Sequence, residues 1–203
     1  ADVVLAVGTR LSDFTTGSHS LFTQARLVNL NVNAFDARKW RGLEVVGDAK
    51  AGLDALAEAL RGWTAAPAWQ VRAKRGATAS RDDIARLTGQ RDVALPYDGD
   101  VIGAVQRSSP LSAAKDIVVC AAGTLPAELH KLWRTTEPGG YHMEYGFSCM
   151  GYEIAGGLGV KMACPDREVV VMVGDGSYLM LNAEIATSVA LGRKLLIVIL
   201  DNR

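Results

Sequence analysis

The chain has 203 residues, of which 49% are hydrophobic and 22% charged, a composition typical of a globular protein that buries a core in one or two domains. Its 22 basic and 22 acidic residues cancel, which argues against charge-driven binding to nucleic acid or to an anionic membrane. Its longest aliphatic run, residues 195–200, is far too short to span a bilayer, and three cysteines without a C-x-x-C pair favour reduced thiols in a cytoplasmic protein.

The first part of the chain alternates short apolar runs with helical patterns. DVVLAV (2–7), RLVNLN (26–31) and LEVV (43–46) are typical of strands, and residues 50–63 carry leucine and alanine at helical spacing. Residues 64–83 predict further helix and a connection. A change of composition with proline and Asp-Gly breaks predicts a domain boundary near residue 92.

The second part repeats this pattern. We predict helices over 100–109, 126–133, 151–163 and 181–192, and strands over 116–120, 168–173 and 195–200. Apolar strands that alternate with helices indicate an α/β protein, here with two parallel-sheet domains, 1–92 and 93–203, that carry helices on both faces. Because the chain starts and stops beside strands, we expect both sheets to be incomplete and the chain to be a fragment of a longer protein.

The segment VVVMVGDGSY (169–178) stops abruptly at Gly174-Asp175-Gly176-Ser177. An Asp-Gly pair between apolar runs can be a hairpin turn, and it can equally be a functional loop at the carboxyl end of a parallel strand. The next strand ends at Asp201-Asn202, so Asp175 and Asn202 can converge at one edge of the sheet. A carboxylate and an amide oxygen suit Mg²⁺ or Ca²⁺, and the glycines allow phosphate groups to approach the backbone.

These residues resemble the thiamine-diphosphate (ThDP) motif of the pyruvate decarboxylase and acetolactate synthase superfamily, in which GDGS is followed at this distance by an Asn-Asn pair. Here Asp201 replaces the first asparagine, and Asn202 keeps the second. SCMGYEIAGGLG (148–159) is similar to the segment that faces the pyrimidine, and AAGTLP (121–126) to the loop beside the diphosphate. The resemblance implies that Asp175 and Asn202 bind Mg²⁺. It further implies that ThDP contacts Gly123, Thr124, Ser148, Met150, Gly174, Asp175, Gly176, Ser177 and Asn202.

Longer segments resemble one family of this superfamily, the trihydroxycyclohexanedione hydrolases of myo-inositol catabolism. They are AVGTRLSDFTTGSHSLF, CAAGTLPAELHKLW, YHMEYGFSCMGYEIAGGLG and VMVGDGSYLMLNAEI, spread over the whole chain. The resemblance implies a homodimeric or homotetrameric enzyme that uses ThDP and Mg²⁺ to open a cyclic polyol dione. Residues 1–92 would be the end of its central domain, and 93–203 its diphosphate-binding domain.

Two alternatives stay open at this point. One is a carboligase similar to acetolactate synthase, and the other is a non-catalytic α/β nucleotide-binding module in which GDGS is only a turn. The resemblance also implies that the glutamate that activates the pyrimidine belongs to an N-terminal domain outside this sequence. No catalytic residue is therefore assigned here, and we expect these 203 residues to be inactive alone.

Overall fold

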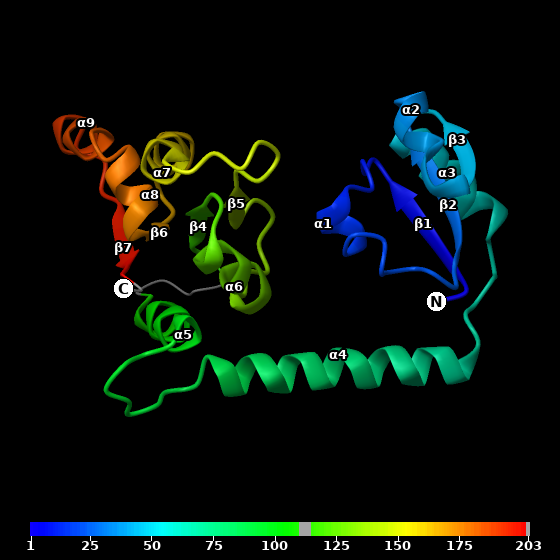
Figure 1. The fold of residues 1–203 in the computed structure, drawn as a ribbon, viewed down its shortest axis with the longest axis horizontal. Helices are drawn as coiled ribbons and strands as arrows, with labels where there is room; N and C mark the ends of the chain where they lie inside the picture. The colour runs from blue at the N-terminus through cyan, green and yellow to red at the C-terminus, as the bar shows by residue number, and fades with distance from the viewer. Residues whose placement is uncertain (110–114, 202–203) are drawn as a thin grey trace. The chain divides into compact units, whose positions relative to one another are not determined.

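The computed structural model describes residues 1–109 and 115–201, which form two compact units, residues 1–69 and 70–203. Each unit contains one parallel sheet with helices on both faces (Figure 1), so the predicted α/β class is confirmed. The division at residue 69 lies near the start of α4 (Pro67–Leu87) and so precedes the predicted boundary near residue 92.

The first unit has a three-stranded sheet in the order β1-β2-β3. Its strands β1 (Val3–Val7), β2 (Arg26–Asn31) and β3 (Leu43–Val46) lie where the sequence predicts them. The predicted helix over 50–63 is α3 (Ala49–Ala59), and the side chain of Asp48 caps its N-terminus by accepting a hydrogen bond from the N–H of Ala51. Three short elements were not predicted: α1 (Asp13–Thr16), α2 (Ala34–Ala37) and the 3₁₀ turn η1 (Lys39–Arg41).

The second unit has a four-stranded sheet in the order β5-β4-β6-β7. Strands β4 (Ile117–Cys120), β6 (Val169–Gly174) and β7 (Leu196–Leu200) match the predicted strands, and β5 (Tyr141–Met143) was not predicted. The predicted helices are α5 (Asp98–Ser108), α6 (Thr124–Leu132), α7 (Tyr152–Ala163) and α9 (Glu184–Ala190), and α8 (Asp175–Met180) is an addition.

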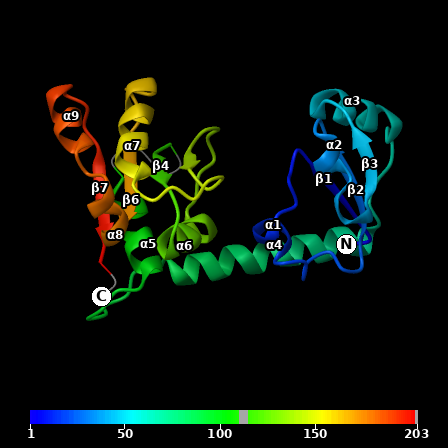
Figure 2. The same cartoon turned by 45° about the horizontal axis from the view of Figure 1, so that its top comes forward.

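Both central strands of this sheet are buried on their two faces. Alternate side chains of a strand point to opposite faces, so β4 and β6 contribute to two separate layers. One layer joins Val118, Cys120, Val170 and Met172 to residues of α5 and α6. On the other face α7 lies against β6 in both views (Figures 1 and 2). This double cover holds the carboxyl ends of the strands in fixed positions.

Candidate functional site

Seven of the nine predicted cofactor residues lie around one cavity at the carboxyl edge of the second sheet. There Gly174, the last residue of β6, is paired in register with Leu200, the last residue of β7. A cavity of about 220 Å³ opens at this edge, between the loop after β4, the end of the loop before α7 and the start of α8. The predicted residues that line it are Gly123, Thr124, Met150, Gly174, Asp175, Gly176 and Ser177.

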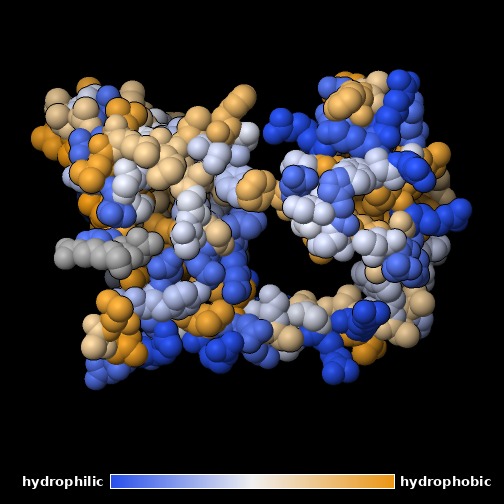
Figure 3. Space-filling model, viewed as in Figure 1, coloured by the Kyte–Doolittle hydropathy of each residue, from blue (hydrophilic) through white to orange (hydrophobic). Residues whose placement is uncertain are grey.

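The GDGS segment is not a hairpin turn. Strand β6 runs parallel to β7, and Asp175 is the first residue of α8, so the chain leaves the sheet instead of folding back. Asp175 is exposed, and among the described residues no atom outside the adjoining backbone lies within 4 Å of the place that a Cβ on Gly174 or Gly176 would occupy. The backbone on both sides of the carboxylate is therefore open to a ligand. Beyond it, α8 exposes Leu179 and Met180, and apolar atoms gather over α8 and α9 (Figure 3).

The loop after β4 turns at Gly123. This residue has φ 124° and ψ −170°, a conformation that is essentially restricted to glycine, and it forms the N-cap of α6. The preceding Ala121 and Ala122 are buried, whereas Gly123 and Thr124 are exposed toward the cavity. The sharp turn thus brings the main chain from the core to the site within two residues.

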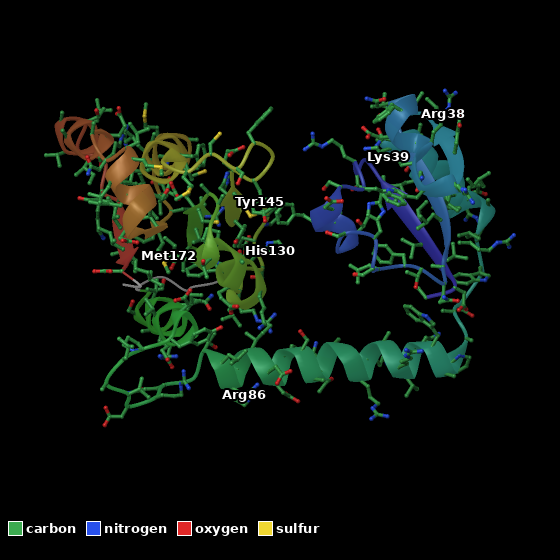
Figure 4. The ribbon with its side chains drawn as sticks, in the orientation of Figure 1. Arg38, Lys39, Arg86, His130, Tyr145 and Met172 are labelled. Atoms are coloured by element: carbon green, nitrogen blue, oxygen red, sulfur yellow. The ribbon has the colours of Figure 1, made fainter. Side chains whose placement is uncertain are left out.

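The loop between β5 and α7 is folded around the carboxylate of Glu144. Its oxygens accept hydrogen bonds from the N–H groups of Phe147 (3.1 Å) and Cys149 (2.7 Å). These bonds favour the charged form and lower the pKa of Glu144 below its ordinary value. The side chain of Glu144 therefore stabilises the conformation of this loop. The next residue, Tyr145, is labelled in Figure 4.

Two of the predicted residues lie at the far end of this loop. Met150 is 44% exposed and lines the cavity. Ser148 is exposed, has a left-handed backbone (φ 59°) and is not among the described residues that line the cavity. Asn202, the second predicted metal ligand, lies outside the described residues.

The hydroxyl of Ser177 is hydrogen-bonded within the protein. It donates to the carboxylate of Glu153, with 2.7 Å to Oε1 and 2.8 Å to Oε2, and it accepts from the N–H of Gly151 at 2.8 Å. The sequence prediction missed Glu153. The available signal was its place as the only charged residue in GYEIAGGLG, because a lone acid among apolar helical positions needs a buried partner.

Asp98, at the start of α5, is a second acid that the sequence prediction missed. It lines the cavity, and partial burial together with the nearby charge of Glu128 raises its pKa. Glu128 also accepts a hydrogen bond from the hydroxyl of Tyr97, which is the main reason that the pKa of Tyr97 is raised to about 12. The hydrogen bond between Tyr97 and Glu128 joins the start of α5 to α6 beside the cavity.

The described residues hold no cluster of three or more His, Cys, Asp or Glu side chains that could bind a metal ion without help. A divalent ion at Asp175 would thus need oxygen ligands from a bound molecule as well as from the protein. Residues 1–109 and 115–201 also contain no helix that is both long and apolar enough to cross a membrane.

Comparison with known proteins finds a family match within the second unit. Residues 121–203 match the family model of the thiamine pyrophosphate enzymes, C-terminal TPP binding domain, where TPP is another name for ThDP. The whole chain is similar to proteins named 3D-(3,5/4)-trihydroxycyclohexane-1,2-dione hydrolase. The identity is 40% for that of Geobacillus thermodenitrificans, 35% for that of Bacillus licheniformis and 38% for that of Bacillus thuringiensis.

Each alignment covers 100% of this chain and 34–35% of the relative, so the chain spans about a third of the length of these relatives. The resemblance to the ThDP enzymes and to these hydrolases, inferred from the motifs, is confirmed.

Proposed function

We propose, starting from the match of residues 121–203 to a TPP binding domain, that this chain anchors ThDP in a hydrolase. Its reaction would be the ring opening of 3D-(3,5/4)-trihydroxycyclohexane-1,2-dione to 5-deoxy-D-glucuronate in myo-inositol catabolism. The substrate is the one that the names of the relatives print. The observation that carries the proposal is the cavity at the carboxyl edge of β6 and β7, which seven residues of the predicted cofactor set line.

The size of the cavity suits one end of the cofactor. Pockets that enclose a whole small molecule have volumes of about 300–1,000 Å³. The cavity has about 220 Å³ and is bordered by exposed glycines, so it matches the diphosphate end of ThDP better than the entire molecule. Gly123 and Thr124 would contact the diphosphate from the loop after β4, and Gly174 and Gly176 would let it approach the backbone.

Asp175 and Asn202 would hold Mg²⁺ on the diphosphate. The exposed carboxylate of Asp175 fits a hard cation, and the phosphate oxygens would supply ligands that the described side chains do not. The hydroxyl of Ser177 is engaged by Glu153, so contact between this residue and the cofactor would be made by its main chain.

Met150 and the main chain near Ser148 would hold the pyrimidine half of the cofactor in its bent conformation. When bound, ThDP supplies a carbanion nucleophile and an electron sink for carbon–carbon cleavage beside a carbonyl group. The contribution of this chain is orientation, since it fixes the cofactor relative to the substrate, and the glutamate that activates the pyrimidine would come from elsewhere in the full-length protein.

The same proposal covers the organisation of the enzyme. Residues 1–92 would form the end of a central domain and residues 93–203 the diphosphate-binding domain of a cytoplasmic homodimer or homotetramer. Exposed apolar side chains on α8 and α9 support an interface in that part of the chain, among them Leu179, Met180 and Val189.

Calorimetry tests the cofactor and an assay tests the substrate. ThDP is titrated into the full-length protein that contains this chain, with Mg²⁺ and with EDTA, and saturable binding is expected only with Mg²⁺. The loaded protein is then offered the cyclic dione and, separately, pyruvate. Absence of ThDP binding would contradict the proposal, and faster formation of acetolactate than ring opening would assign the protein to the carboligases.

A further inference from the structure

Glu153 is an acid buried beside the proposed cofactor site. Its side chain leaves the first turn of α7 and is 1% exposed, and it is not among the described residues that line the cavity. Removing a charged carboxylate from water is costly unless hydrogen-bond donors replace the water. The donors that surround Glu153 therefore indicate what its burial achieves.

Those donors come from two different segments. The hydroxyl of Ser177 donates to the carboxylate at 2.7 Å, and the N–H of Gly151 donates to Oε2 at 2.9 Å and to Oγ of Ser177 at 2.8 Å. The three groups form a closed triangle. Two of its three sides, Ser177–Glu153 and Ser177–Gly151, join the start of α7 to α8, so displacing either segment breaks both of them.

The triangle joins the two segments that the proposed function needs. Gly151 directly follows Met150, and Ser177 directly follows Gly176, the second glycine beside Asp175. One corner thus belongs to the loop that faces the pyrimidine and another to the segment that faces the metal and the diphosphate.

Close packing at Gly151 supports a fixed spacing. This residue has φ 95°, and a Cβ placed on it would lie 3.2 Å from Cβ of Leu181, just beyond α8. A side chain at this position would be both strained and crowded. The backbone before α7 is therefore pressed against the end of α8, in addition to being hydrogen-bonded to it.

We propose that Glu153 is a positioning residue that sets the distance between Met150 and Asp175 and thereby the affinity for ThDP. This role rests on the proposed function. A simpler role as a helix cap needs only the bond from Gly151, because that N–H belongs to the N-cap of α7. The bond from Ser177, on another helix, distinguishes the two roles.

The test measures the Kd of ThDP with Mg²⁺ by calorimetry in the full-length protein, without turnover. Glu153→Gln keeps the shape of the side chain and one acceptor, whereas Ser177→Ala removes the bond between the helices. Each is expected to weaken ThDP binding about tenfold, the effect of losing one buried hydrogen bond. The double variant should bind ThDP no more weakly than the single variant with the lower affinity, since both substitutions disrupt the same triangle.

Ser188→Ala is the matched control, because Ser188 lies in α9 and its buried hydroxyl donates to the carbonyl of Arg193, beyond the end of that helix and not at the cavity. Its thermal midpoint should fall like that of Ser177→Ala while its Kd for ThDP stays unchanged.

The outcomes separate the role from the function on which it rests. If the wild-type protein does not bind ThDP, the proposed function and the role of Glu153 both fail. If it binds ThDP and Glu153→Gln binds equally well, the positioning role alone is overturned. Equal loss of affinity in Ser188→Ala, or fully additive losses in the double variant, would also overturn it.

Discussion

Polar residues near the carboxyl ends of the strands are buried in the first sheet and exposed in the second. In the first unit, Asn29 and Asn31 on β2 are buried. The amide of Asn29 donates to main-chain carbonyls at the end of α2 and in η1, and that of Asn31 donates to the carbonyl of Thr9. In the second unit, Asp175 follows β6 with its carboxylate exposed and glycines on both sides. An asparagine whose side chain is already hydrogen-bonded to main-chain carbonyls stabilises the fold. An exposed acid beside open backbone is available to bind a ligand.

The largest expected effect follows from removing that acid. Asp175→Ala should lower the affinity for ThDP in Mg²⁺ at least about 100-fold, because even residues that only support a metal ligand contribute up to this factor. The thermal midpoint without cofactor should stay unchanged, since the carboxylate is exposed. Calorimetry and thermal unfolding of the full-length protein measure both quantities.

Asp54→Ala is the control for this change, because Asp54 is an exposed acid of α3 that pairs with Lys50. It should leave ThDP affinity intact. Equal ThDP affinity in the wild-type protein and Asp175→Ala would contradict the assignment of Asp175 as a metal ligand. It would also contradict the contrast drawn between the two sheets.

A smaller effect is expected at Gly123, where the backbone turns from β4 into the site. Gly123→Ala should destabilise the protein by about 1–3 kcal/mol, the cost of forcing a side chain into this backbone region. Gly159→Ala in α7 is a suitable comparison, since a Cβ there would meet no atom of the described residues within 4 Å beyond the backbone of its own helix. Urea denaturation should separate the two variants, and equal stability would show that the turn at Gly123 tolerates a side chain.

The first sheet offers the reciprocal test. Asn29→Ala should lower the free energy of unfolding by about 1–2 kcal/mol, because the carbonyls of Ala37 and Lys39 lose their donor. Its affinity for ThDP, measured by calorimetry, should equal that of the wild-type protein. A weaker affinity would show that the edge of the first sheet contributes to cofactor binding as well.

The smallest effect concerns the pH dependence of the loop that carries Met150. The lowered pKa of Glu144 means that its carboxylate stabilises the fold fully above the ordinary glutamate pKa, and that this contribution is lost as pH falls through the lowered value. Glu144→Gln should therefore reduce the fall of the thermal midpoint between neutral and acid pH. Glu137→Gln, at an exposed glutamate of this unit, should keep the wild-type slope.

The sequence predicted the described strands other than β5 from their apolar residues, and β2 and β3 match their predicted bounds. It missed β5, because Tyr141–Met143 is a three-residue strand with a histidine at its centre and no apolar run around it. It also missed α8, where glycine after the first residue weakens the helical pattern.

The same limit applies to the site. GDGS identified the edge of the sheet because its residues are adjacent in the chain. The contact between Glu153 and Ser177 joins residues 24 positions apart, and it becomes visible only when α7 and α8 are packed together.

The shared hydrogen bond of Gly151 has a consequence for exchange of amide protons with solvent. Its N–H is buried and held by two acceptors, so it can exchange only when α7 and α8 separate. The N–H groups of Phe147 and Cys149, a few residues earlier, are bound to Glu144 in an exposed stretch and can exchange by a local movement of the loop. In the connection between β5 and α7, the amide protons of Phe147 and Cys149 can therefore exchange by local opening. That of Gly151 exchanges only when α7 and α8 move apart.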